Sequence, residues 1–186
     1  MVEKLFQDLY EKYHRDVYQF LFYLVKNKEQ AEDLVQEVYI KALKSYGGFQ
    51  GNSSEKTWLF SIARHTAIDW FRKQKRQKRS WADFIDWKEQ TIEWRDHEPL
   101  PDEIAERNEE TKHLYNVLKK CPVNHQLVLV LRFIQSYSIK ESAEILGWSE
   151  SKVKTTQHRA LKALREQMEE ESRRREAGDY DELKVR

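Results

Sequence analysis

The chain has 186 residues, of which 39% are hydrophobic and 35% are charged. This length allows one medium domain or two small ones, and the high charged fraction favours two small units with much solvated surface. The aromatic content of 12% excludes a disordered chain, the single cysteine, Cys121, excludes an intramolecular disulfide, and the net charge of +1 does not by itself indicate a nucleic-acid partner.

The first half of the chain predicts three helices, because its apolar residues recur at helical spacing and no period-2 strand pattern is present. The first helix covers residues 5–24. Asn27 is a suitable N-cap for the second helix, and Gly47 is a suitable stop for it. Ser54 lies in a polar loop that can cap a third helix, which we expect over residues 57–79.

The second half of the chain separates into an acidic segment and further helices. Acidic residues and two prolines dominate residues 80–103, so we predict a linker that joins a domain of residues 1–79 to a domain of residues 104–170. The charged residues 171–186 are predicted to form a fraying tail. The expected fold is all-α, with an N-terminal helical bundle and a C-terminal helix-turn-helix joined by an acidic linker.

The strongest local signal is a helix-turn-helix between residues 138 and 164. Ser138 and Glu141 have the spacing of a capping box, and Gly147 suits the turn that follows the first helix. Ser149 can cap the second helix. A short helix, a turn with glycine and a second capped helix is the layout that this motif requires.

The second helix of this unit presents a basic face. No acidic residue occurs between residues 151 and 165, and the apolar positions are Val153, Leu161 and Leu164. Donor side chains on such a recognition helix reach base edges and phosphates in the major groove. The alternative is an ordinary helical hairpin with a solvated basic face, but the one-sided charge favours DNA binding. The candidate DNA-contacting residues are Lys154, Thr155, His158 and Arg159.

The helix predicted over residues 57–79 carries a second basic surface. Lysine and arginine at this density attract a phosphate backbone. Trp70 and Phe71 lie on the apolar stripe, so core packing is favoured over stacking on bases. The preceding polar loop could hold a flipped base, although a plain connector is the simpler interpretation. The candidate residues are Gln50, Gly51, Asn52 and Ser53 in the loop, and Arg64, His65, Arg72 and Lys73 on the helix.

The second predicted helix has an acidic surface. Its polar positions recur at spacings of one, three, four and five residues, which places them on one side of a helix. A solvated helix surface and a docking surface for a basic protein partner both fit this pattern, and residue chemistry leaves the two open. The residues concerned are Glu32, Asp33, Gln36 and Glu37.

Three segments in this order resemble the extracytoplasmic-function sigma factors of bacterial RNA polymerase, most nearly the sigma-X type of Gram-positive bacilli. The family's core-polymerase-binding helix is similar to AEDLVQEVYIKAL, residues 31–43. Its minus-ten helix is similar to TWLFSIARHTAIDWFRKQKR, residues 57–76. Its minus-thirty-five helix-turn-helix is similar to VLRFIQSYSIKESAEILGWSESKVKTTQHRALKALR, residues 130–165. A helix-turn-helix alone is common, but the three segments together cover nearly the whole chain.

The resemblance implies a specificity subunit that directs core RNA polymerase to promoter DNA and helps to open the minus-ten region. It implies that the acidic surface contacts the clamp coiled coil, that the polymerase flap is a second contact, and that the polar loop captures a flipped base. It also implies regulation by a membrane-bound anti-sigma factor. No enzymatic activity, cofactor, metal or small-molecule ligand is expected. His65 and Trp148 depart from the family pattern, which affects the expected base preference and not the class.

Other protein classes share parts of this pattern. A one-component transcription regulator would use the same helix-turn-helix, but the sequence offers neither an effector pocket nor a dimerisation helix. An enzyme would need clustered ligands or a phosphate-binding loop, whereas the six histidines are scattered and no HExxH motif occurs. A structural helical adaptor is the third alternative, and sequence-independent DNA binding would favour it.

The sequence contains no segment that is typical of membrane insertion. Its longest apolar run, residues 127–131, is far too short to span a bilayer. Its N-terminus lacks the apolar core of a signal peptide. We therefore expect a soluble, cytoplasmic protein.

Overall fold

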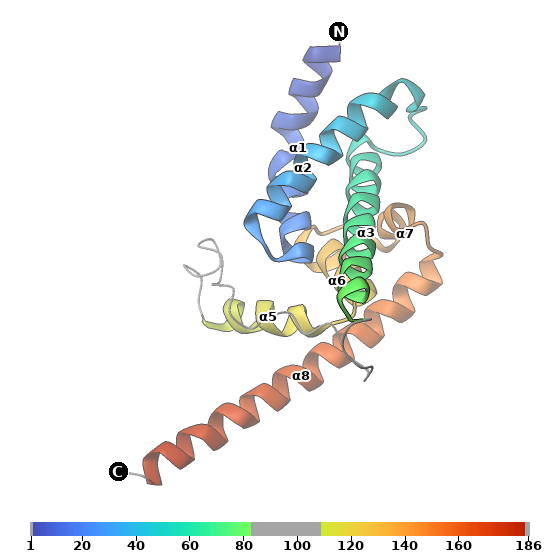
Figure 1. Ribbon diagram of the computed structural model, residues 1–186. Helices are drawn as coiled ribbons and strands as arrows, with labels where there is room; N and C mark the ends of the chain where they lie inside the picture. The colour runs from blue at the N-terminus through green and yellow to red at the C-terminus, as the bar shows by residue number, and fades with distance from the viewer. Residues whose placement is uncertain (1, 83–108, 185–186) are drawn as a thin grey trace.

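The computed structural model describes residues 2–82 and 109–184, and every regular element in these two ranges is a helix (Figure 1). The expected all-α fold is therefore confirmed. The N-terminal module, residues 2–82, contains α1 (Val2–Val25), α2 (Lys28–Ser45), the short 3₁₀ helix η1 (Tyr46–Gly48) and α3 (Glu55–Ala82). The C-terminal module, residues 109–184, contains α5 (Glu109–Lys120), α6 (Val123–Leu129), the π-helical turn η2 (Val130–Ile134), α7 (Ile139–Leu146) and α8 (Glu150–Lys184).

Side-chain caps begin several of these helices where the sequence predicts them. The Asn27 side chain accepts a hydrogen bond from the backbone N–H of Gln30 at 2.9 Å, which caps α2. The Ser54 hydroxyl accepts from the backbone N–H of Thr57 at 3.0 Å, at the start of α3. Each cap satisfies a backbone donor that the helix itself leaves without a partner.

The first helix of the helix-turn-helix, α7, is capped at both ends. Ser138 Oγ accepts from the backbone N–H of Glu141 at 3.1 Å, and the Glu141 carboxylate accepts from the backbone N–H of Ser138 at 2.8 Å. Gly147 ends α7 with φ of 63°, a left-handed conformation that glycine adopts without steric cost. Ser149 Oγ then accepts from the backbone N–H of Lys152 at 3.2 Å and caps α8.

The N-terminal module buries one apolar stripe from each of its three long helices. The stripe of α3 includes Leu59, Phe60, Ala63 and Ala67, at the spacing of one helix face. These side chains pack against the buried residues of α1 and α2. Most charged residues of the same helices therefore lie on the opposite, exposed side.

In the C-terminal module, α6 and α7 pack against α8 (Figure 1). Val153 and Ala160 of α8 are fully buried, and Ala143 of α7 is small enough for the two helices to cross closely. Leu161, one of the apolar positions of this helix, is 36% exposed. Ala160 takes the inward position, seven residues after Val153, which corresponds to two full helical turns.

Two boundaries differ from those expected. Helix α3 continues to Ala82, so the first residues of the predicted linker are helical, and residues 83–103 of that linker lie outside the described residues. Instead of a tail that frays from residue 171, α8 continues to Lys184. Glutamate and arginine are the most frequent residues of this segment, and their high helix propensity favours the continuation. Helix α6 changes to π geometry at Val130, where the Gln135 N–H donates to the Val130 carbonyl at 2.9 Å.

The two modules pack against each other, which the sequence does not predict. α3 contacts α7, and α1 contacts both α6 and η2. One cluster of buried residues therefore includes side chains of both modules.

We expect Ser138→Ala to lower the free energy of unfolding by about 1 kcal/mol, because it removes a hydroxyl that caps α7. Ser151→Ala, at an exposed position of α8, is the matched control and should change stability little. Denaturant unfolding followed by circular dichroism measures both. Equal stability of the two variants would show that the capping box contributes nothing.

Candidate nucleic-acid interface

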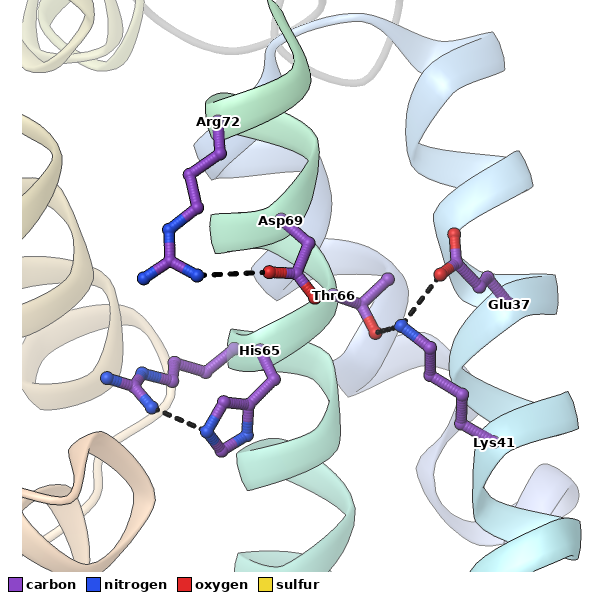
Figure 2. Close-up of polar contacts among 7 residues, drawn as sticks. Glu37, Lys41, His65, Thr66, Asp69 and Arg72 are labelled. Atoms are coloured by element: carbon purple, nitrogen blue, oxygen red, sulfur yellow. Dashed lines mark hydrogen bonds and ion pairs between the residues drawn. The ribbon is translucent and has the colours of Figure 1, made fainter.

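The predicted acidic surface is an exposed side of α2. Glu32, Asp33, Gln36 and Glu37 are all solvent-exposed, while Leu34, Val35 and Val38 point into the core. The Glu37 carboxylate pairs with the Lys41 amine at 2.7 Å, and Lys41 also donates to the Thr66 hydroxyl of α3 at 3.2 Å (Figure 2). Lys41 therefore joins the end of the acidic surface to α3, a connection that sequence spacing alone does not show.

The basic residues predicted on α3 occupy a different side of the module. His65, Arg72 and Lys73 are exposed, and Arg72 extends on the side of α3 opposite Lys41 (Figure 2). Arg72 pairs with Asp69 at 3.4 Å, which is a solvent-exposed and therefore weak interaction. Arg72 thus remains able to exchange this carboxylate for a phosphate.

Arg64 and His65 form a small hydrogen-bonded unit. The Arg64 guanidinium donates to His65 Nε2 at 2.8 Å, and His65 Nδ1 donates to the Ser61 carbonyl at 2.7 Å. These two bonds require a neutral imidazole with its proton on Nδ1. Burial, with the nearby Arg72 charge, lowers the pKa of Arg64 from its ordinary value. Arg64 is half-buried, and its Nε has no hydrogen-bond partner within the described residues.

The polar loop between η1 and α3 adjoins a cluster of three packed aromatic rings, which we call the aromatic cluster. Phe49 packs against Trp58 with ring centroids 5.1 Å apart, and Tyr46 packs against both of these rings. In the loop next to this aromatic cluster, Gln50, Gly51 and Asn52 are exposed and Ser53 is half-buried. The sequence analysis missed the aromatic cluster, although the three aromatic residues that flank the loop were its visible signal. A loop with an exposed polar tip on a packed aromatic cluster suits the capture of a ligand.

The basic face of α8 is exposed as predicted. Lys154, Thr155, His158 and Arg159 all lie in solvent, on the side of α8 away from the buried Val153 and Ala160. The Thr155 hydroxyl donates to the Ser151 carbonyl of its own helix at 2.9 Å, so it presents a methyl group and an acceptor outward.

The turn that precedes α8 contains a contact that the sequence analysis did not foresee. The Lys152 amine lies 4.3 Å from the centroid of the Trp148 ring, a distance typical of a cation–π interaction. The contact orients Lys152 at the start of the recognition helix. The large Trp148 side chain therefore has a local partner in the turn.

The predicted sites remain three separate surfaces. The acidic surface and the α3 surface belong to the N-terminal module, and the α8 surface belongs to the C-terminal module. Within residues 2–82 and 109–184 no group of three His, Cys, Asp or Glu residues could hold a metal ion. Among the described helices none is both long and apolar enough to cross a membrane. Exposed charged surfaces of this kind fit binding to macromolecules.

Comparison with protein families identifies two regions of the chain. Residues 9–77 match the family model described as Sigma-70 region 2, and residues 117–166 match the model described as Sigma-70, region 4. The chain is 56% identical over 168 residues to the ECF RNA polymerase sigma factor SigX of Bacillus subtilis strain 168, covering 90% of this chain and 86% of that protein. It is 38% identical over 169 residues to the RNA polymerase sigma factor YlaC of the same organism, covering 87% of this chain and 91% of that one.

Two solved structures share the fold. The sigma factor RpoE from Bartonella quintana, crystallised with the anti-sigma factor NepR, aligns with a TM-score of 0.67 and 23% identity over 88% of this chain and 96% of that one. CnrH, solved with the cytosolic domain of CnrY, aligns with a TM-score of 0.64 and 20% identity over 90% of this chain and 89% of that one. At these identities the likeness shows the fold alone.

We expect Gly51→Ala to destabilise the loop between η1 and α3 by about 1 kcal/mol, because the residue has φ of 71° and a side chain is strained there. Gly47→Ala is the matched control, since Gly47 has ordinary backbone angles and equally open surroundings. Thermal unfolding of the full chain compares the two. A loss that is as large for the control would contradict the conformational argument.

Proposed function

The chain belongs to the extracytoplasmic-function RNA polymerase sigma factors and acts in promoter-specific transcription initiation, and from this premise we propose which of its surfaces performs each step. The observation that carries the assignment is that both sigma-70 regions occur in order on one chain, while the surfaces they present are exposed and opposite in charge. We assign residues 1–79 to region 2, residues 80–103 to the linker, residues 104–170 to region 4 and residues 171–186 to a charged extension.

The acidic surface of α2 is the docking site for core polymerase. Glu32, Asp33 and Glu37 carry negative charge on the exposed side of α2, away from the residues that pack into the core. Such a surface attracts a basic partner helix and raises the rate of association. The clamp coiled coil of the polymerase is the partner that the family resemblance indicates, and the flap is its counterpart for region 4.

The α3 surface and the preceding loop act on the minus-ten element. Arg64, Arg72 and Lys73 supply cations for the phosphates of one strand. We assign to the exposed tip of the loop, which follows Phe49, the capture of a base that has left the duplex. Removal of a base from the stack costs a few kcal/mol, and contacts in such a pocket offset that cost.

The basic face of α8 reads the minus-thirty-five element as a duplex. Helix-turn-helix proteins place the N-terminal part of their second helix in the major groove, and here this part carries Lys154, His158 and Arg159. Because the two modules are tethered, binding of one raises the effective concentration of the other at the promoter. Neither module then needs high affinity of its own.

Regulation by an anti-sigma protein is part of the proposal. RpoE was solved with the anti-sigma factor NepR and CnrH with the cytosolic domain of CnrY, and both share the fold of this chain. We infer that a membrane-bound anti-sigma factor covers the polymerase-binding and DNA-binding surfaces here. The chain acts as a subunit of the transcription machine and has no catalytic role of its own.

The double substitution Asp33→Arg with Glu37→Arg should weaken binding to core polymerase at least tenfold, because it reverses the charge of the docking surface. Glu29→Arg with Lys28→Glu, in the exposed first turn of the same helix, conserves net charge and is the control. Biolayer interferometry with purified core enzyme measures both. Unchanged affinity of the reversed variant would refute the docking assignment.

Arg159→Ala should reduce affinity for promoter duplex by about 1–3 kcal/mol, and only for sequences with the matching base, if the guanidinium makes a bidentate base contact. Lys162→Ala, one turn further along α8, is the control for loss of positive charge alone. Fluorescence anisotropy with a set of single-base variants of the duplex distinguishes the loss of a base contact from the loss of positive charge alone. An equal loss on every sequence would assign Arg159 to a phosphate.

Run-off transcription with core polymerase over a promoter library tests the whole proposal. The full chain should initiate RNA synthesis at defined start sites, and alignment of the active promoters should show two conserved elements. A chain that binds DNA but neither binds core polymerase nor starts synthesis would instead be a one-component regulator.

A further inference from the structure

The exposed side of α3 that carries the basic residues also carries one acid. Five exposed residues recur at spacings that place them on this side of the helix: His65, Asp69, Arg72, Lys73 and Arg76. Asp69 is the one acidic residue of α3 after the first position of the helix. A carboxylate repels the phosphates that its basic neighbours attract. On a surface that binds DNA, Asp69 therefore lowers affinity unless it makes a contact of its own.

Asp69 forms a weak ion pair with Arg72, three residues further along α3. Arg72 Nη1 donates to Asp69 Oδ1 at 3.4 Å, and the side chains of Arg72 and Asp69 are 71% and 61% exposed (Figure 2). Within the part of the chain that the structure describes, the Asp69 carboxylate has no other partner. An exposed pair of this length contributes little to stability, so Arg72 can leave Asp69 at small cost.

A second arginine covers a second acceptor one turn earlier on α3. Arg64 donates to His65 Nε2 at 2.8 Å (Figure 2), and His65 Nδ1 donates to the Ser61 carbonyl at 2.7 Å. The bond to Ser61 keeps the proton on Nδ1 and leaves Nε2 as an acceptor. Helix α3 thus presents two acceptors, four residues or about 6 Å apart along its axis, and each is bonded to an arginine.

Both arginines have a stronger partner in DNA than in this helix. A guanidinium binds phosphate through two parallel charge-assisted hydrogen bonds, whereas His65 offers one neutral nitrogen and Asp69 a single long bond. When Arg64 and Arg72 bind phosphates of a DNA strand, the two acceptors become free on the surface next to that strand. The donors that suit them are the exocyclic amino groups of bases, on N6 of adenine, N4 of cytosine and N2 of guanine. Thymine has no such group.

We propose that Asp69, together with His65, reads bases of the opened minus-ten strand by accepting hydrogen bonds from their exocyclic amino groups. Arg64 and Arg72 cover these acceptors in the free chain and bind phosphates in the complex. The inference rests on the proposed function, since it adds base reading to the α3 surface that we assign to the minus-ten strand. Asp69 is a binding residue in addition to the candidates expected from the sequence.

The simpler explanation is that Asp69 only holds Arg72 in position, as exposed pairs three residues apart on a helix do. The two explanations differ in what removal of the carboxylate does. If Asp69 only holds Arg72, its removal changes binding of all DNA sequences by the same factor, and the loss of repulsion favours a gain. If Asp69 accepts from an amino group, its removal weakens binding only where the DNA carries that group.

Base analogues that lack the amino group test the proposal. The full chain in complex with core polymerase is titrated with fork-junction DNA, whose single-stranded minus-ten segment is taken from a promoter selected by run-off transcription. Each adenine, cytosine or guanine of that segment is replaced in turn by purine, 2-pyrimidinone or hypoxanthine. Loss of the amino group should lower affinity about fivefold or more at one or two neighbouring positions. Equal affinity for the natural bases and all analogues would overturn the proposal.

Substitutions of Asp69 identify the acceptor. Asp69→Ala should lower affinity for the natural base about fivefold at one sensitive position and leave affinity for the analogue unchanged or higher. Asp69→Asn should keep part of the discrimination, because an amide oxygen still accepts a hydrogen bond. A change by the same factor for natural and analogue DNA would show that Asp69 acts only through Arg72 and would overturn the proposal.

Glu166→Gln is the matched control for the loss of a carboxylate. Glu166 is also exposed and forms a weak ion pair on its own helix, with Lys162 at 3.8 Å, but it belongs to the C-terminal module. The substitution should leave affinity for natural and analogue minus-ten DNA within about twofold of the unsubstituted chain, as expected for a surface change.

A double substitution separates the acceptor from the ion pair. Arg72→Gln should weaken binding of natural and analogue DNA alike, because it removes a phosphate contact. Asp69→Ala in the Arg72→Gln background should still remove the discrimination between them. If Arg72→Gln alone removes the discrimination, Arg72 and not Asp69 reads the base.

His65 has a test of the same design. His65→Ala should remove the discrimination at the second sensitive position, and His65→Gln should restore part of it, since the glutamine oxygen is again an acceptor. Discrimination that His65→Ala leaves intact at every position would remove His65 from the proposal.

The same titrations keep this inference and the proposed function distinguishable. If Arg72→Gln and Lys73→Gln weaken binding while no amino group matters, the minus-ten surface stands and base reading by Asp69 fails. If the complex with core polymerase binds no minus-ten DNA, or binds it equally well without these cations, the assignment of the α3 surface fails and the inference fails with it.

Discussion

The side chain of Phe60 is the contact on which the rest of the structure depends. Its ring packs against Phe20 of α1 with centroids 5.3 Å apart and against Tyr137 of the C-terminal module at 5.1 Å, and none of it is exposed. One residue of α3 thus belongs to the core of the N-terminal module and to the boundary between the modules. A large aromatic ring in such a position is packed by side chains of both modules at once, because protein interiors leave few voids.

The exposed surfaces follow from this packing. Each long helix uses one side for the core, and the chain places its charges on the remaining sides: acids on α2, and bases on α3 and on the start of α8. The net charge of +1 hides this separation, since it sums 33 basic and 32 acidic residues over the whole chain. Separate surfaces of opposite sign allow one chain to attract a basic protein and an acidic polymer at the same time.

The boundary between the modules differs in kind from the two cores. The cores are apolar, whereas the boundary contains Lys26, Gln126, Gln19 and Gln135. These polar groups form hydrogen bonds across the boundary, as buried polar groups must if their burial is not to cost free energy.

Local sequence determined the helices, their caps and the outward faces, because these depend on residues three or four positions apart. Asn27, Ser138 and Gly147 perform the roles that their spacing predicts, and the candidate residues of α2, α3 and α8 lie on the helix sides expected of them. Helical propensity was underestimated in α8, where the predicted fraying tail is helix as far as Lys184. Only the tertiary structure decided three other features: the aromatic cluster next to the loop, the hydrogen bond from Lys41 to Thr66 and the burial of the Lys26 amine. Their partners lie 9 to 100 positions away in the sequence, and no periodicity relates residues that meet only because two separate helices have packed together.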